Sequence, residues 1–114
     1  MKENLSGIYR THWGWKSKSY EALAVIFHSS DNAIIGLEIC TDSDKTNGGT
    51  YLLKGEVTKT KITGKWWKLN NSQRGGFSLR INSIRKQWQG GYNISIKSKE
   101  YPYVYTFNYI RKIK

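Results

Sequence analysis

Cysteine, proline, histidine and acidic residues are all scarce in this chain, and the scarcity excludes several classes of structure and function. The single cysteine, Cys40, cannot form an intramolecular disulfide, so the fold does not depend on such bonds. No run of about 18 apolar residues occurs, which excludes a membrane-spanning helix within these 114 residues. The N-terminus lacks a basic start followed by an apolar run and a cleavage site, and we therefore expect an intracellular chain.

Catalytic and metal-binding motifs are equally sparse. The only histidines, His12 and His28, stand at metal-ligand spacing neither from each other nor from Cys40, and no H-x-E or C-x-x-C pattern occurs. The eight carboxylates are spread along the chain, and neither G-x-S-x-G nor a phosphate-binding glycine loop is present. We predict a protein with no enzymatic activity, no metal and no cofactor. An enzyme remains the alternative.

The composition favours β-strands. A single proline stands against 11 glycines, and β-branched and aromatic residues occur in runs separated by turn-forming segments such as SSDN. No segment shows a sustained helical period, which argues against parallel strands joined by helices. The predicted strands cover Ser6 to Trp15, Tyr20 to His28, Ala33 to Cys40, Thr50 to Thr58, Lys61 to Leu69, Gly76 to Asn82, Gln87 to Lys97 and Pro102 to Ile110.

A chain of this length fits one domain with a single core. Eight antiparallel strands can close on themselves, which removes unpaired edges and leaves an interior for side chains or one small ligand. We predict an all-β fold: one closed, eight-stranded, antiparallel β-barrel of the up-and-down, lipocalin-like kind, spanning residues 1–114. A two-sheet sandwich is the alternative.

The alternation of side chains sorts some strand faces. Phe77, Leu79 and Ile81 share one face, which we assign to the core, while Ser78 and Arg80 lie on the other. The second predicted strand and the last one are apolar on both faces. Part of the outer surface is therefore expected to be covered, by a neighbouring subunit or by an absent segment.

Positive charge is in large excess. The chain has 19 Lys and Arg against 8 Asp and Glu, a formal net charge of +11, which is more than solubility requires. This excess predicts an anionic partner, although polynucleotides, nucleotides, membrane surfaces and acidic proteins all respond to the same field. A basic surface without a specific partner is the alternative.

Basic and aromatic residues are interleaved in three stretches: YRTHWGWK from Tyr9, GKWWK from Gly64 and RGGFSLRINSIRKQWQGGY from Arg74. Cationic groups pair with phosphate oxygens and aromatic rings stack on bases, so the combination suits a nucleotide. The phosphate-binding candidates are Arg10, Lys68, Arg74 and Arg80, and the candidates for stacking or pocket walls are Tyr9, Trp13, Trp66, Trp88 and Tyr92. The alternative is that the tryptophans fill the barrel core. Single-stranded polynucleotide is a less favoured ligand.

Three motifs, L-S-G-I-Y from Leu5, R-G-G-F-S-L from Arg74 and Q-G-G-Y from Gln89, occur in an order and spacing that resemble a known family. It is the C-terminal β-barrel domain of the two-transmembrane-helix effectors of bacterial CBASS anti-phage defence. The resemblance implies an eight-stranded barrel that senses a cyclic di- or oligonucleotide. Binding would drive homo-oligomerisation and membrane disruption through helices that precede Met1, as in a cytoplasmic domain of an inner-membrane protein.

Two other functions remain open at this point. A phage protein that sequesters cyclic nucleotide signals would use the same barrel without any membrane helix. A carrier of small hydrophobic ligands, as lipocalin and avidin barrels are, would have an apolar lumen and an affinity insensitive to salt.

Overall fold

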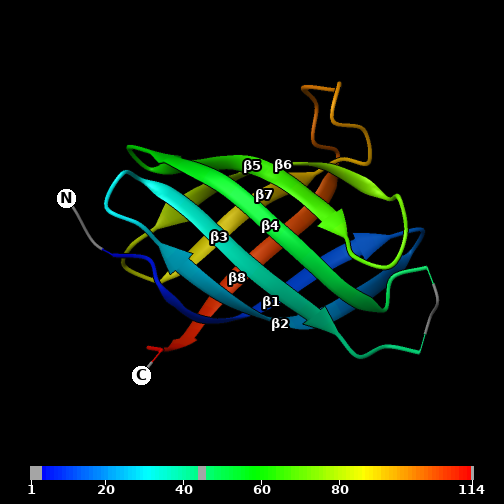
Figure 1. Ribbon diagram of the computed structural model, residues 1–114, viewed down its shortest axis with the longest axis horizontal. Helices are drawn as coiled ribbons and strands as arrows, with labels where there is room; N and C mark the ends of the chain where they lie inside the picture. The colour runs from blue at the N-terminus through cyan, green and yellow to red at the C-terminus, as the bar shows by residue number, and fades with distance from the viewer. Residues whose placement is uncertain (1–3, 44–45, 114) are drawn as a thin grey trace.

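The computed structural model describes residues 4–43 and 46–113, and every regular element in that part of the chain is a β-strand (Figure 1). No helix in the described residues has the length and apolar character needed to cross a membrane. The eight strands are β1 (Gly7–Trp15), β2 (Lys18–His28), β3 (Ala33–Cys40), β4 (Gly49–Thr58), β5 (Lys61–Lys68), β6 (Arg74–Asn82), β7 (Gln87–Tyr92) and β8 (Tyr103–Arg111).

The strands form a closed up-and-down barrel. Each strand pairs antiparallel with the next one in sequence, and β8 pairs antiparallel with β1, so that the sheet has no open edge. The prediction of a closed eight-stranded antiparallel barrel is confirmed, and the two-sheet sandwich is excluded. Because the strands alternate in direction, the odd-numbered strands finish at the same end of the barrel at which the even-numbered strands begin.

The first hairpin turns more tightly than expected. Lys16 and Ser17 both have positive φ angles, 48° and 68°, and Trp15 lies opposite Lys18. Two consecutive left-handed residues give a two-residue hairpin whose twist matches that of the flanking strands. Strand β2 therefore begins at Lys18, two residues before the predicted start at Tyr20.

The seventh strand is shorter than predicted, because Asn93 turns the chain out of the sheet. β7 ends at Tyr92 and not at Lys97. The buried side chain of Asn93 accepts a hydrogen bond from Gly76 N at 2.7 Å and donates to the carbonyls of Ser98 and Glu100 at 3.2 and 2.9 Å. These bonds hold residues 93–102 as a loop that leaves the barrel between β7 and β8, at the upper right in Figure 1.

The core fills the barrel with large side chains. Phe77 and Leu79 are almost fully buried, as their alternation predicts, and Phe107 and Trp88 stack against each other with ring centroids 4.9 Å apart. Two glycines allow backbones to approach closely, because a Cβ on Gly75 or Gly90 would lie 2.0 Å from the carbonyl oxygen of Asn93 or Ser78.

The two ends of the barrel differ. At the end where β1 begins, Tyr9 packs on Trp88 with ring centroids 4.4 Å apart, and its hydroxyl donates to the carbonyl of Leu5 at 2.7 Å. All three side chains are buried, and only a small cavity of about 80 Å³ remains beside them. The opposite end is hollow, and it holds the candidate functional site.

Candidate ligand-binding site

A cavity of about 480 Å³ opens at the end of the barrel where β1 ends and β8 begins. Every strand except β2 contributes to its wall, together with the loops that join β3 to β4, β5 to β6 and β7 to β8. This volume lies within the range of small-molecule sites. The lining residues are Trp13, Trp15, Glu38, Thr46, Asn47, Tyr51, Trp66, Ser72, Gln73, Arg74, Tyr92, Ile94, Ser95, Ile96, Lys97 and Tyr105.

Hydrogen bonds at their polar ends hold three aromatic rings in the cavity wall. The indole N–H of Trp13 donates to Asn47 Oδ1 at 2.9 Å, and that of Trp66 donates to the carbonyl of Asn93 at 3.0 Å. The hydroxyl of Tyr92 donates to the carbonyl of Gly14 at 2.6 Å. Because the polar groups are satisfied by the protein, the rings present apolar faces to a ligand.

A buried carboxyl group lies inside the cavity. Glu38 is two residues inward from the end of β3 and is only 3% exposed. The Tyr105 hydroxyl lies 2.9 and 3.0 Å from its two carboxyl oxygens and donates to them. Burial raises the pKa of Glu38 to about 7, and the Thr11 and Tyr105 hydroxyls partly offset that rise. Near neutral pH, Glu38 is therefore present both as the ionised carboxylate, which only accepts hydrogen bonds, and as the neutral acid, which also donates one.

Asn47 offers an unused donor in the same cavity. Its side chain is 7% exposed, and its Nδ2 has no hydrogen-bond partner among the residues that the structure describes. Its Oδ1 accepts from Trp13, and its backbone carbonyl accepts from the hydroxyl of Tyr51 at 2.6 Å. A buried amide without a partner is costly, and a ligand acceptor in the cavity would satisfy it.

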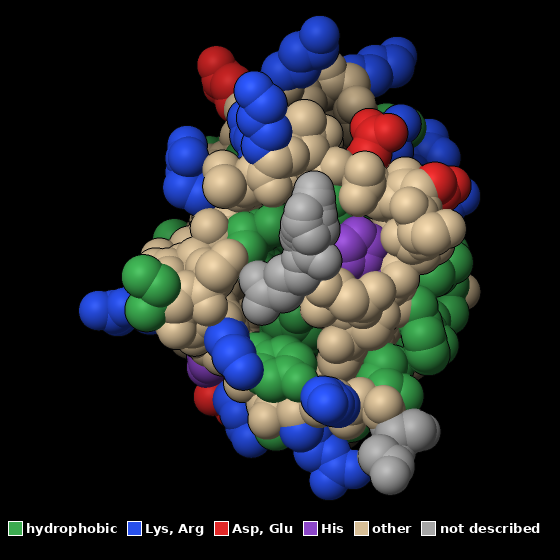
Figure 2. All heavy atoms as spheres, turned by 90° about the vertical axis from the view of Figure 1, so that its left-hand side faces the viewer, with side chains coloured by type: hydrophobic (Ala, Val, Ile, Leu, Met, Phe, Trp, Pro, Cys, Tyr) green, Lys and Arg blue, Asp and Glu red, His purple; other side chains and the backbone are tan. Residues whose placement is uncertain are grey.

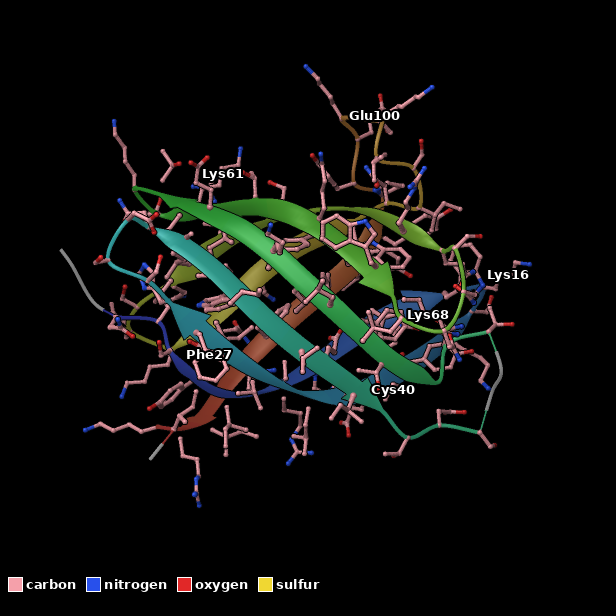
Figure 3. The ribbon with its side chains drawn as sticks, in the orientation of Figure 1. Lys16, Phe27, Cys40, Lys61, Lys68 and Glu100 are labelled. Atoms are coloured by element: carbon pink, nitrogen blue, oxygen red, sulfur yellow. The ribbon has the colours of Figure 1, made fainter. Side chains whose placement is uncertain are left out.

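Positive charge surrounds the mouth. Arg74 and Lys97 line the cavity and are exposed. Lys68 belongs to the same inward-facing row as Glu38 and Tyr51, since these residues lie opposite one another on β5, β3 and β4. Its Nζ donates to the carbonyl of Thr46 at 2.9 Å and lies 5.8 Å from the centroid of the Tyr51 ring. Lys68 and Lys16 both lie toward this end of the barrel (Figure 3).

The structure brings part of the predicted site together. Four of the nine candidates line the cavity: Trp13, Trp66, Arg74 and Tyr92. Lys68 is not among the lining residues; it is 2% exposed, and its ammonium group contacts the lining residues Thr46 and Tyr51.

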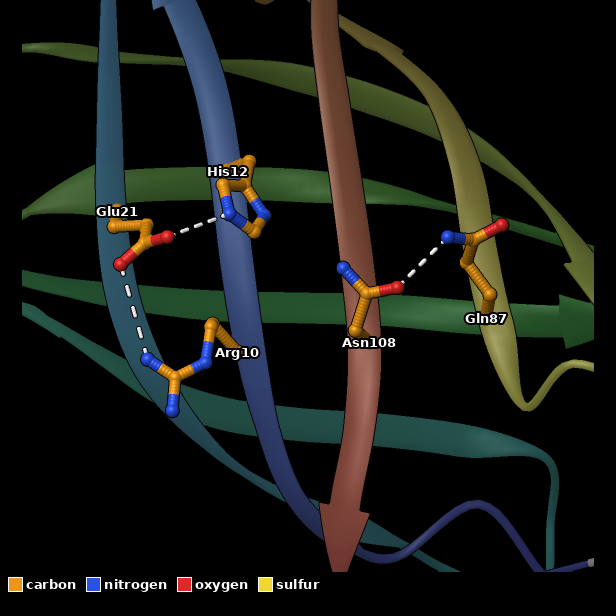
Figure 4. Close-up of polar contacts among 5 residues, drawn as sticks. All are labelled: Arg10, His12, Glu21, Gln87 and Asn108. Atoms are coloured by element: carbon orange, nitrogen blue, oxygen red, sulfur yellow. Dashed lines mark hydrogen bonds and ion pairs between the residues drawn. The ribbon is translucent and has the colours of Figure 1, made fainter.

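The other four candidates lie elsewhere. Tyr9 and Trp88 belong to the packed opposite end, which agrees with the alternative that some tryptophans fill the core. Arg10 and Arg80 are exposed on the outer face, and Arg10 Nη1 lies 3.8 Å from Glu21 Oε1 (Figure 4). We do not include these four in the site.

The inner polar residues Glu38, Asn47 and Tyr105 were not among the predicted candidates, and neither was Lys97 at the mouth. Glu38 is the only acidic residue in the run AIIGLEIC, and its spacing from Ile34 and Gly36 places it on the inner face of β3. This spacing is the feature of the sequence from which the inward position of Glu38 could have been predicted. Nothing in the sequence marks Asn47, because its position depends on the fold of the β3–β4 loop.

Neither histidine lines the cavity. No group of three or more His, Cys, Asp or Glu that could hold a metal ion occurs in the part of the chain that the structure describes. His12 lies on the outer face with its Nε2 2.8 Å from Glu21 Oε2 (Figure 4), and the Nδ1 of His28 accepts from Leu5 N at 2.9 Å. Both histidines therefore have structural partners outside the cavity.

Comparison of the chain with protein family models, with curated proteins and with solved structures finds no match in any of the three.

Proposed function

We propose that this barrel is a receptor for a cyclic nucleotide, which binds in the cavity with a base inside and phosphate at the mouth. The observation that carries the proposal is one cavity that combines fixed aromatic rings, a buried carboxyl group and exposed cations. Each part meets a different part of a nucleotide: rings stack on a base, polar groups bond its edge, and cations pair with phosphate.

The inner part of the cavity suits the edge of a base. Trp13, Trp66 and Tyr92 supply apolar surface, while Glu38 and the Nδ2 of Asn47 supply an acceptor and a donor. Heterocyclic bases present donors and acceptors side by side on one edge, so this pair supports recognition of a base. A purely apolar ligand would leave the Nδ2 of Asn47 unpaired.

The mouth suits phosphate. The guanidinium of Arg74 can bond two phosphate oxygens at once, and Lys97 adds a second charge on the β7–β8 loop. Because both side chains are exposed, the attraction is screened by salt. Affinity for a nucleotide should therefore fall as ionic strength rises.

For the biological role of nucleotide binding, we keep the role that the CBASS resemblance predicts. In that reading the barrel detects an anti-phage cyclic nucleotide signal and oligomerises, and attached membrane helices disrupt the inner membrane. A barrel that only sequesters the signal would have the same cavity, and the gene sequence upstream of Met1 distinguishes the two.

The direct test is a thermal-shift screen of the protein against cyclic di- and trinucleotides, cyclic oligoadenylates and their linear counterparts at low and high salt. A ligand at a hundred times its dissociation constant stabilises the native state by about 2.7 kcal/mol, which corresponds to a rise of several degrees in Tm. A rise with a cyclic species, smaller at high salt, supports the proposal. The absence of a rise with every member of the panel would contradict it.

A carrier of apolar ligands is the second candidate. It is favoured by Ile94 and Ile96, which line the cavity from the β7–β8 loop beside the aromatic wall. This function predicts a Tm rise with fatty acids or aromatic hydrocarbons that does not change with salt. Such a result together with no response to nucleotides would replace the proposal.

A further inference from the structure

The strands β2 and β3 carry large apolar side chains on their outer faces as well as on their inner ones. The buried inner positions hold Tyr20, Ala22, Ala24, Ile26, Ile34, Gly36, Glu38 and Cys40. The outer face of the two strands, which we call the apolar face, consists of Leu23, Val25, Phe27, Ile35, Leu37 and Ile39. Strand β6 shows the usual arrangement, with Phe77 and Leu79 inside and Ser78 and Arg80 outside. The outer faces of β2 and β3 therefore depart from the alternation of a half-solvated strand, whose outer side is polar.

The apolar face is a continuous surface. The register pairs Leu23 with Ile39, Val25 with Leu37 and Phe27 with Ile35, which places the six side chains in three adjacent cross-strand rows. All but Val25 are between 45% and 53% exposed. Their combined accessible area is roughly 400 to 500 Å², in the range where an exposed patch on a single protein marks an interaction site. Figure 2 shows hydrophobic side chains gathered along the right-hand edge of that view.

The charge around this face differs from that of the rest of the chain. Residues 19–53 contain one basic and five acidic residues, of which Glu38 lies inside the barrel, whereas the rest of the chain contains 18 basic and three acidic residues. The neighbouring strands contribute Arg10 opposite Leu23 and Lys54 opposite Ile35, and Arg10 is close to Glu21. An anionic membrane or a nucleic acid would be drawn to the basic parts of the surface and not to this one. A second copy of a protein with net charge +11 meets the least repulsion here.

We propose that the apolar face is a homodimer interface, which packs against the same face of a second copy about a two-fold axis. Two sheet faces pack about 10 Å apart with interdigitated side chains, and a flat row of Leu, Ile and Val suits such packing. A two-fold interface needs only one self-complementary surface. The apolar face supplies more than half of the roughly 800 Å² per partner of a standard specific interface, and its polar rim would supply the rest. None of the six residues of the apolar face lines the cavity, so this dimer does not cover the cavity lining.

The test is sedimentation analysis of the ligand-free protein over a wide concentration range, with the variants Leu37→Lys and Val104→Lys. Leu37 lies in the middle row of the apolar face, whereas Val104 is a 64% exposed apolar residue on β8. The wild type and Val104→Lys should form a dimer of the 13.2 kDa chain, and Leu37→Lys should raise the dissociation constant about tenfold or more. Circular dichroism and thermal unfolding check that each variant folds.

A second variant keeps the test decisive if Leu37→Lys does not fold. Phe27→Thr places a β-branched residue at an exposed strand position and should weaken the dimer in the same direction. A monomeric wild type at all concentrations would overturn the proposal, and co-sedimentation of that monomer with phospholipid vesicles would assign the face to a membrane instead. Equal dimerisation of wild type, Leu37→Lys and Phe27→Thr would also overturn it.

Discussion

The hydroxyl of Tyr105 lies 2.9 and 3.0 Å from the two carboxyl oxygens of Glu38, inside the barrel and two residues inward from its open end. Burial and the nearby carboxyl raise the pKa of Tyr105, so the phenol stays protonated and remains the donor. The carboxyl group thus has a fixed donor in Tyr105 and retains bonding capacity toward the cavity.

Glu38 should make stability depend on pH. Its pKa is raised from 4.5 to about 7 in the folded protein, so the folded state binds a proton more tightly than the unfolded state. The free energy of unfolding should therefore fall as pH rises between these values, by up to about 3 kcal/mol. Glu38→Gln should remove this decline, as measured by denaturant unfolding from pH 4 to pH 8. Glu56→Gln, at an exposed position on β4, serves as the control and should keep the decline.

The same group should make base preference depend on pH. The ionised carboxylate accepts two hydrogen bonds and suits the adjacent N–H donors of guanine, whereas the neutral acid donates and accepts and suits the edge of adenine. Titrations of guanine and adenine cyclic dinucleotides should therefore show opposite trends through the pKa of about 7. If the affinities for both ligands changed with pH in the same direction, Glu38 would not be the group that distinguishes the bases.

Asn93 should hold the β7–β8 loop over the cavity. Asn93→Ala leaves the N–H of Gly76 without its 2.7 Å partner and frees the carbonyls of Ser98 and Glu100. We expect a loss of about 2 to 4 kcal/mol in the free energy of unfolding and faster amide exchange in residues 93–102. Asn71→Ala removes one exposed bond to Gln73 N at 2.8 Å and should have little effect. Equal losses in the two variants would contradict this role.

Gly75 should tolerate no side chain. A Cβ there would lie 2.0 Å from the Asn93 carbonyl oxygen and 2.7 Å from Trp66 Nε1, so Gly75→Ala must move the hydrogen bond that fixes the Trp66 ring. We expect destabilisation of about 2 kcal/mol or more, together with a changed tryptophan fluorescence spectrum. Gly14→Ala is the matched variant, because its nearest contact would be at 3.7 Å, and it should change stability by less than about 0.5 kcal/mol. Similar stability of the two variants would show that the barrel adjusts at Gly75.

The fold could be predicted because alternation and turn chemistry act locally. Phe77 and Leu79 alternate with polar residues, and short turns force neighbouring strands to pair antiparallel. The end of β7 was missed because the side chain of Asn93 bonds Gly76, 17 residues away in sequence, and no local pattern reports such a contact.

The site could be predicted only in part, because residue type does not tell which end of the barrel a side chain occupies. Trp13 and Trp88 are both inward-facing tryptophans on odd-numbered strands, yet Trp13 lies near the end of β1 and Trp88 near the start of β7. Strand direction therefore places Trp13 at the cavity and Trp88 in the packed end. Arg74 and Arg80 differ in the same way. Arg74 is the first residue of β6 and lies at the cavity, whereas Arg80 is near the end of the strand and does not line the cavity.

Those two arginines provide the most direct test of the central claim, that the cavity binds a cyclic nucleotide with phosphate at its mouth. The measurement is calorimetric titration of the wild type, Arg74→Ala and Arg80→Ala with the cyclic nucleotide that gives the largest thermal shift, at low and high salt. Arg74→Ala should weaken binding about tenfold or more and reduce its salt dependence, while Arg80→Ala should bind as the wild type does. Unchanged affinity in a folded Arg74→Ala variant, or an equal loss in both variants, would contradict the account.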